Sequence, residues 1–273
     1  MKNIIDVCFL IRNKNNFKKN YSNFFKNYER KKPNIKHNMH VILKGFNNKD
    51  ILELKRIYKK KIIFHILPNL YYDIGSYYLI AKKLKNDFCI FFNSNTIIRN
   101  KNWLNYFQKY TNNDIGIIGT SVSNETMAFR TPYYDSNQKF RFILRFFYRL
   151  LTRTHLGIYF NYFPNTHIRT NGFLINRESF IDFMKKRKLP KKKFDCYLLE
   201  SSKNSITKYF ENIGKKVLVI GNNGKSYEKN QFKFSNTFVH KYKNNCLIFD
   251  NQISNYLSKN KYFKKEIYHD VWG

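Results

Sequence analysis

The chain has 273 residues, of which 42% are hydrophobic and 25% are charged. This length fits one large α/β domain or two small ones, and the hydrophobic share supports a buried core, which excludes disorder throughout. Lys and Arg outnumber Asp and Glu by 51 to 18, a net charge of +33, so polyanions, acidic membrane surfaces and phosphorylated ligands are candidate partners. Lys, Asn, Ile, Phe and Tyr have codons rich in A and T, so a low-GC genome would produce much of this bias without selection for binding.

The first hundred residues alternate between short β-rich runs and helical patterns, as in a parallel sheet with crossover helices. The run 88–92 is fully apolar, which is typical of a strand at the centre of a sheet. The pattern predicts an α/β fold with a mostly parallel central sheet flanked by helices. The expected strands are 6–11, 39–43, 62–67 and 88–92, and the expected helices are 17–28, 51–57 and one from the turn at 73–76 through 85.

The second half is less regular. Pro190 and the like charges around it predict a solvated loop at 185–193, and Gly214 predicts the end of a helix. No internal repeat and no Pro/Ser-rich linker divides the chain, so we expect a single domain over 1–273. The expected helices are 103–110, 139–153, 177–187 and 202–213, and the expected strands are 115–119, 170–175 and 217–220.

The four cysteines, Cys8, Cys89, Cys196 and Cys246, form no CxxC pair and have no companion His at zinc-finger spacing. A structural zinc site or a disulfide framework is therefore not expected, and Cys8 and Cys89 lie in apolar runs that predict burial. The apolar stretch 4–11 is interrupted by an aspartate and offers no cleavage site, and no run reaches the roughly 18 apolar residues of a spanning helix. We expect a cytoplasmic protein that is soluble or at most lies on a membrane.

Polar residues follow two of the expected strands, at the edge where ligands of open parallel sheets bind. After the third strand, Gly75 would allow close backbone approach, and the following helix would offer free N–H groups to a phosphate or ribose. Alternatively, Asp73 or Ser76 caps that helix. After the fourth strand, Asn93-Ser94-Asn95 could coordinate a metal or a phosphate, or cap a turn.

The order of these elements resembles the nucleotide-sugar-binding half of GT-A glycosyltransferases, specifically family-2-like enzymes. The resemblance is carried by Asn69, Asp73 and Gly75, by the helix after them, and by the apolar strand that ends at Asn93-Ser94-Asn95. It implies a GT-A (Rossmann-like) fold and an enzyme that binds a nucleotide-sugar donor.

Two downstream segments extend the resemblance over most of residues 4–220. The segment 167–177 looks like the family's acceptor-side segment, and 194–203 resembles the stretch that holds the catalytic carboxylate. The resemblance thus implies a nucleotide-sugar-binding half at about 1–100, an acceptor and catalytic half at about 101–235, and a C-terminal extension at 236–273.

The resemblance makes Glu200 the candidate general base, which would take a proton from an acceptor hydroxyl in an inverting transfer. The family's Glu-Asp pair is here Glu200-Ser201, and one carboxylate is enough for this role. The alternative is a helix-start glutamate near the positive end of the dipole. The implied donor-binding residues are Asn69, Asp73, Gly75, Asn93, Asn95, Arg169 and Lys203, and the implied acceptor-side residues are Thr170 and Asn171.

The metal-binding Asp-x-Asp of the family is replaced by Asn93-Ser94-Asn95. Amides are weaker ligands for a hard cation than carboxylates, so a Mg²⁺ or Mn²⁺ cofactor stays open, with Asn95 and His240 as candidate ligands. Without a strong metal site, cations must stabilise the leaving diphosphate. Arg169, Lys203 and His240 are candidates, though each could equally be a surface charge.

The expected helix 139–153 carries Arg141, Arg145, Arg149 and Arg153 at every fourth position. At 100° per residue, these arginines share one face and an apolar set occupies the other. Such a helix could lie on an anionic membrane, which suits a lipid-linked acceptor, or it could pack its apolar face on the core. The apolar set is Phe140, Ile143, Leu144, Phe147, Leu150 and Leu151.

Taken together, these patterns favour a glycosyltransferase that acts on a glycan or lipid-linked acceptor in bacterial surface-polysaccharide synthesis. A basic nucleic-acid or anionic-surface binder is a rival, motivated by the pI near 10 and by 27 Phe and 21 Tyr. Most of these aromatics lie at core-like spacing rather than interleaved with cations, which disfavours nucleic acid. A transferase fold without catalysis is the third hypothesis. Beyond these elements, Asp250 of Asp250-Asn251-Gln252 is expected to cap a helix start, with a role at the acceptor site as the less favoured alternative.

Overall fold

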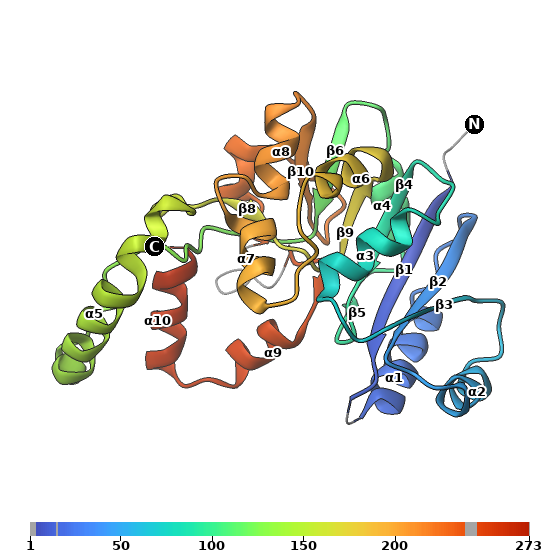
Figure 1. Cartoon of the computed structure of the whole chain (residues 1–273), viewed down its shortest axis with the longest axis horizontal. Coiled ribbons are helices and arrows are strands. Elements are labelled where there is room, and N and C mark those ends of the chain that lie inside the picture. The colour runs from blue at the N-terminus through green and yellow to red at the C-terminus, as the bar shows by residue number, and fades with distance from the viewer. Residues whose placement is uncertain (1–3, 15, 238–244, 273) are drawn as a thin grey trace.

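A computed structural model gives the structure of the chain and describes residues 4–14, 16–237 and 245–272. Its centre is an eight-stranded sheet in the order β11-β10-β6-β9-β4-β1-β2-β3 (Figure 1). The strands are β1 (Ile5–Arg12), β2 (His37–Lys44), β3 (Ile63–Leu67), β4 (Phe88–Phe92), β6 (Ile115–Gly119), β9 (Phe173–Asn176), β10 (Lys216–Ile220) and β11 (Ser226–Tyr227).

The sheet is mostly parallel, as the sequence predicts. The pairs β3/β2, β2/β1, β1/β4 and β6/β10 are parallel, and β9 runs antiparallel between β4 and β6. The strand and helix order predicted for the first hundred residues is confirmed, and the apolar run of β4 is completely buried next to β1. The carboxyl ends of β1 and β4 therefore meet at one edge of the sheet.

Helices cover both faces of the sheet because its strands carry apolar side chains in alternation toward each face. The side chains of α1, α2 and α4 pack on one face, and those of α3, α6, α7 and α8 pack on the other. The helices are α1 (Phe17–Arg30), α2 (Asn48–Ile57), α3 (Asp73–Ala81), α4 (Trp103–Gln108), α6 (Arg177–Lys185), α7 (Lys193–Ser201) and α8 (Ile206–Asn212).

The connection before β9 departs from the predicted strand 170–175. A short strand β8 (His167–Ile168) pairs with β7 (Val122–Ser123), and the chain then bends before β9 begins. Gly172 makes this bend at φ +64°, and a Cβ there would lie 2.8 Å from Ile248 Cγ1. The position therefore needs glycine, and the bend keeps the residues before it out of the strand.

Helix α7 also departs from the sequence prediction. It occupies Lys193–Ser201, for which no helix is predicted, and it overlaps the predicted loop 185–193 only at Lys193; the loop itself is confirmed at 186–192. The next helix begins at Ile206 with a cap from Ser205 rather than near 202. Glu200 thus lies at the end of α7, so its interpretation as a helix-start glutamate is wrong. Gly214 follows α8 with φ +71°, as expected of a helix stop.

The basic helix is confirmed as α5 (Lys139–Arg153), which projects from the body beside α10 (Lys261–Val271) (Figure 1). Its arginines contact α10: Arg145 pairs with Glu266, and Arg149 donates to both oxygens of Asp270 at 3.0 and 2.6 Å. Arg141 Nη2 lies 3.3 Å from Glu266 Oε2. Carboxylates of the same chain therefore already bind Arg141, Arg145 and Arg149, which the membrane interpretation did not expect. The alternative interpretation, that the helix packs its apolar face on the core, is wrong, because Phe140 is 75% exposed and Leu151 is 79% exposed.

All four cysteines are free thiols, and Cys8 and Cys89 are fully buried, as predicted. Burial raises the pKa of both thiols well above the usual range. Within the part of the chain that the structure describes, no helix is long and apolar enough to span a bilayer.

Candidate functional site

A cavity of about 500 Å³ opens at the carboxyl ends of β1 and β4. The segments after β1 and β4, the starts of α1 and α3, the bend before β9, helix α7 and the start of α9 (Asn251–Ser258) all contribute to its lining. Residues from the predicted donor half, the predicted acceptor half and the C-terminal extension therefore surround one space. The predicted site residues that line it are Asp73, Asn93, Asn95, Arg169, Thr170, Asn171 and Glu200.

One wall of the cavity carries an ion pair between Arg12, the last residue of β1, and Asp73, the first residue of α3. Arg12 Nε donates to Asp73 Oδ1 at 3.1 Å, and the guanidinium lies 5.3 Å from the Tyr72 ring centroid. Asp73 is not the helix cap, because Tyr72 occupies that position. The pair thus leaves an aromatic ring, a cation and a carboxylate together on one wall of the cavity.

Lys44 lies beside this wall, at the end of β2 and paired in register with Arg12. It is 1% exposed, and its ammonium has no hydrogen-bond partner among the described residues. Burial, the charges of Arg12 and Lys14, and opposing contributions from Asp73 and Cys196 together lower the pKa of Lys44 to about 8. A buried cation thus lies within electrostatic range of four groups that line the cavity.

Glu200 lies on the opposite wall, where two donors from one residue orient it. Its Oε1 accepts hydrogen bonds from the Thr170 backbone N–H at 2.7 Å and from Thr170 Oγ1 at 2.9 Å. Among the described residues, Oε2 accepts no hydrogen bond. Glu200 also borders a smaller adjoining cavity of about 80 Å³, which Glu125 and His167 line. Thr170 therefore holds the carboxylate through one oxygen, and the residue borders both cavities.

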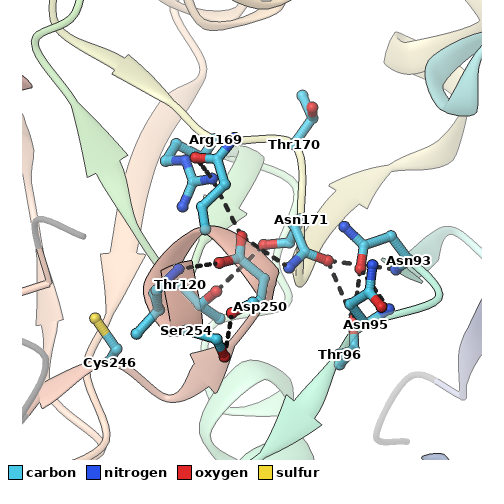
Figure 2. Close-up of polar contacts among 12 residues, drawn as sticks. Asn93, Asn95, Thr96, Thr120, Arg169, Thr170, Asn171, Cys246, Asp250 and Ser254 are labelled. Atoms are coloured by element: carbon cyan, nitrogen blue, oxygen red, sulfur yellow. Dashed lines mark hydrogen bonds and ion pairs between the residues drawn. The ribbon is translucent and has the colours of Figure 1, made fainter. Parts of the chain in front are cut away.

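A hydrogen-bonded network connects the strand-end asparagines with the start of α9 (Figure 2). Asn171 Oδ1 accepts from the Asn93 N–H at 3.3 Å and from Thr96 Oγ1 at 3.2 Å, and its Nδ2 lies 3.5 Å from Asp250 Oδ2. Asp250 also accepts from Arg169 Nη2 at 3.1 Å and, as predicted, caps α9 through the Ile253 N–H at 3.0 Å. The network fixes the floor of the cavity and neutralises much of the charge of Arg169.

The donor set does not fit a dedicated divalent-cation site. The three carboxylates of the cavity, Asp73, Asp250 and Glu200, are bound to Arg12, Arg169 and Thr170, respectively. Asn93 Oδ1 accepts the Asn95 N–H at 3.0 Å, so this amide oxygen is also in use. Residues 4–14, 16–237 and 245–272 contain no cluster of three or more His, Cys, Asp and Glu side chains suited to a metal.

Cys196 also lines the cavity but is not equipped as a nucleophile. Burial, with the nearby charges of Asp73 and Glu200, raises the pKa of its thiol to about 12. Because the thiolate is the reactive form, covalent catalysis by Cys196 at neutral pH is disfavoured.

Three predicted donor-binding residues do not line the cavity. Asn69 is exposed beside Gly45, and Lys203 directs its ammonium to the Gly157 carbonyl at 2.7 Å. Gly75 lies in the first turn of α3, where a Cβ would come within 3.0 Å of Pro190 Cδ and Tyr71 Cβ. Its close approach is therefore to a neighbouring loop and not to a ligand. The predicted metal ligand His240 lies outside the described residues.

No family model and no curated protein matches the sequence. Solved structures match in fold at 8 to 11% identity. A mannosyltransferase from Pyrobaculum calidifontis, in complex with GDP-Man and Mn²⁺, matches at 9% identity and TM-score 0.41, over 67% of this chain and 47% of its own. The chain thus spans about half of that protein.

Two further matches represent different activities. The 4-diphosphocytidyl-2C-methyl-D-erythritol synthase of Anaerococcus prevotii matches at 11% identity and TM-score 0.45, over 80% of this chain and 87% of its own. The glucosyl-3-phosphoglycerate synthase of Mycobacterium tuberculosis matches at 11% identity and TM-score 0.37, over 65% and 58%. The chain is similar in fold to nucleotide-diphospho-sugar transferases. The likeness is one of fold alone, since the three matches described have TM-scores of 0.37 to 0.45.

Several residues that line the cavity are not predicted from the sequence. They include Arg12, Lys14 and Lys193. The position of Arg12 at the end of an apolar strand was a usable signal, since it lies at the ligand-binding edge of the expected sheet. No comparable signal existed for Lys193, which belongs to a charge run interpreted as a solvated loop.

Proposed function

We propose that the chain is a glycosyltransferase that moves a sugar from a nucleotide-diphosphate donor to a glycan or lipid-linked acceptor in bacterial surface-polysaccharide synthesis. The observation that carries the proposal is the Glu200 carboxylate, which Thr170 holds at the border between the large cavity and the smaller one. A donor in the first space and an acceptor hydroxyl reaching in from the second would meet at this group.

In the proposed reaction, Glu200 accepts the proton of the acceptor hydroxyl as that oxygen attacks the anomeric carbon. Attack from the face opposite the diphosphate inverts the configuration of that carbon. Thr170 keeps the carboxylate oriented through two hydrogen bonds, so little reorganisation is needed as the proton moves. Thr170 and Asn171 line the large cavity next to Glu200, so in this scheme they would contact the acceptor only where it enters that cavity.

The donor would bind along the Arg12–Asp73 wall, with Asn93 and Asn95 near the diphosphate. The negative charge that develops on the leaving group would be met by the cavity cations Arg12, Lys14 and Lys193. These cations, rather than Lys203, would stabilise the leaving diphosphate. Arg169 would contribute less to this stabilisation, because it is already paired with Asp250. No step of this scheme uses a metal, and a divalent cation would have to arrive with the donor.

The first test is to identify the donor and then to remove the base. UDP-, GDP-, dTDP- and CMP-sugars are screened by thermal shift with and without Mn²⁺, and turnover is measured with the donor that stabilises the chain. Glu200→Gln is expected to keep the thermal shift and to lose at least about 100-fold in turnover.

The matched control is Glu178→Gln, since Glu178 is a 77% exposed glutamate on α6 that does not line the cavity. It should retain full turnover. Full activity of Glu200→Gln would refute the assigned base. A protein that no nucleotide sugar stabilises would instead be a transferase fold without catalysis, or a binder of anionic surfaces.

A further inference from the structure

The side of α5 opposite its arginines is an exposed apolar surface. Leu151 is 79% exposed, Phe140 75%, and Leu144 and Phe147 each 56%. We define the apolar face of α5 by six side chains, each at least 39% exposed. They are Phe140, Ile143, Leu144, Phe147, Leu150 and Leu151.

This orientation is the reverse of an ordinary amphipathic surface helix, which buries its apolar stripe. Arg149 is 3% exposed in its ion pair with Asp270, and Glu266 binds Arg141 and Arg145. Because α10 satisfies the polar side of α5, turning the helix over would break these pairs. The apolar face is therefore held outward, and its six side chains are each at least 39% exposed within the described chain. The helix itself projects from the body, with α10 beside it (Figure 1).

The positive charge around this face favours an anionic partner. No acidic residue occurs between Asp135 and Glu178, while Lys139 begins α5 and Arg153 ends it. The exposed tyrosines Tyr148 and Tyr159 add amphipathic rings of the kind that settle at membrane interfaces. A second copy of the chain would bring another net charge of +33, which opposes association, whereas an anionic bilayer brings the opposite charge.

We propose that the apolar face of α5 inserts into the interface of an anionic membrane, with α10 on the side away from the lipid. The arginines act inside the protein and hold the helix in this orientation. Binding then combines burial of apolar side chains with attraction between the basic chain and acidic headgroups.

The surface is connected to the candidate site through η2 (Thr154–Ile158) and helix α7. The backbone N–H of Lys203 donates to the Tyr159 carbonyl at 2.9 Å, and the Lys203 ammonium donates to the Gly157 carbonyl. The centroids of the Tyr159 and Phe194 rings are 6.3 Å apart. Phe194 and Glu200 belong to the same helix. A membrane under α5 would thus lie near the acceptor side, which deepens the proposed function by favouring a lipid-linked acceptor.

The test measures binding to vesicles in the absence of any nucleotide sugar. Leu144→Gln, Phe147→Gln and Leu151→Gln are combined, because glutamine preserves helix propensity at these exposed positions. The control combines Leu52→Gln, Ile66→Gln and Leu70→Gln, which are 57%, 55% and 64% exposed and lie outside α5. Circular dichroism verifies the fold of each variant, and co-sedimentation with phosphatidylcholine vesicles that contain 30% phosphatidylglycerol gives the partition coefficient.

The wild-type chain and the control are expected to bind these vesicles alike, and the α5 variant to bind at least about tenfold more weakly. Equal binding by the α5 variant would overturn the proposal, because general attraction to the lysines would then be sufficient. Light scattering that shows a wild-type dimer, converted to monomer by the α5 variant, would assign the face to a second copy instead. Glu200→Gln should bind vesicles normally, which keeps this result distinct from a failure of the proposed activity.

Discussion

Arginine–carboxylate ion pairs occur in two regions of the molecule, the cavity at the sheet edge and the contact between α5 and α10. In the cavity, Arg12 pairs with Asp73 and Arg169 pairs with Asp250, yet all four side chains still line an open space of about 500 Å³. Between α5 and α10, the Arg149 side chain is only 3% exposed, and its ion pair with Asp270 is buried in the contact between the two helices.

The comparison of these two regions shows that an ion pair does not by itself identify a binding site. A pair beside a cavity can exchange partners with a ligand, whereas a pair that fills a helix contact has no space for one. The α5 arginines looked like the strongest candidates for an external partner in the sequence, but in the structure Arg141, Arg145 and Arg149 form ion pairs with α10.

The largest effect expected from this comparison is on the helix contact. Burial opposes the charge of Asp270, but hydrogen bonds from His269 and Arg149 and the charges of Arg149 and Arg145 lower its pKa to about 2. Arg149→Gln removes the main partner of this carboxylate and should lower the free energy of unfolding by about 3 kcal/mol, measured by urea denaturation.

Arg141→Gln is the matched control on the same helix, since its side chain is 41% exposed and its ion pair is more solvated. It should cost less than about 1 kcal/mol. Equal losses for the two variants would mean that burial does not distinguish the pairs of α5.

The second prediction concerns the cavity pair. Arg12→Gln should raise the dissociation constant of the stabilising nucleotide at least about tenfold, while the free energy of unfolding changes by less than about 1 kcal/mol, because both partners are partly solvated. Calorimetric titration and urea denaturation measure the two quantities. Arg56→Gln, an exposed arginine of α2, should change neither. Unchanged affinity of Arg12→Gln would remove Arg12 from the donor site.

The smallest effect concerns Lys44. Its pKa of about 8 lies below the ordinary value of 10.5, so the folded chain carries the cost of a buried charge at neutral pH. This cost disappears as pH rises from about 8 to 10.5, because there the folded state has lost a proton that the unfolded state still binds. Lys44→Met should therefore stabilise the chain by about 1–2 kcal/mol at pH 7 and progressively less toward pH 10.5.

Denaturation at a series of pH values measures the difference between wild type and Lys44→Met. Lys26→Met, at an exposed lysine of α1, should show no such pH-dependent gain. If Lys44→Met destabilised the chain at neutral pH, the Lys44 ammonium would stabilise the fold, and the prediction that its buried charge costs stability would be wrong.

The sequence alone determined the strand and helix order of the first hundred residues, because periodic apolar patterns and helix breakers act over a few neighbouring positions. The amphipathic character of 139–153 was likewise readable from its periodicity. Glu200 and the strand-end asparagines were singled out through the family resemblance, and the structure shows that they line one cavity, while their roles stay predictions. The sequence did not reveal α7, which begins within a lysine run that looked like a loop, or the bend at Gly172, whose need for glycine comes from Ile248, distant in sequence.

Only the tertiary structure decided which charges face the cavity and which face another helix. Lys203 and Gly75 satisfied local patterns, yet their environments are Gly157 and Pro190 rather than a ligand. The orientation of α5 was likewise open in the sequence, because its two faces are equally regular and the choice depends on Glu266 and Asp270 more than a hundred positions away. Local periodicity determines the faces of a helix, but long-range contacts determine which face is buried.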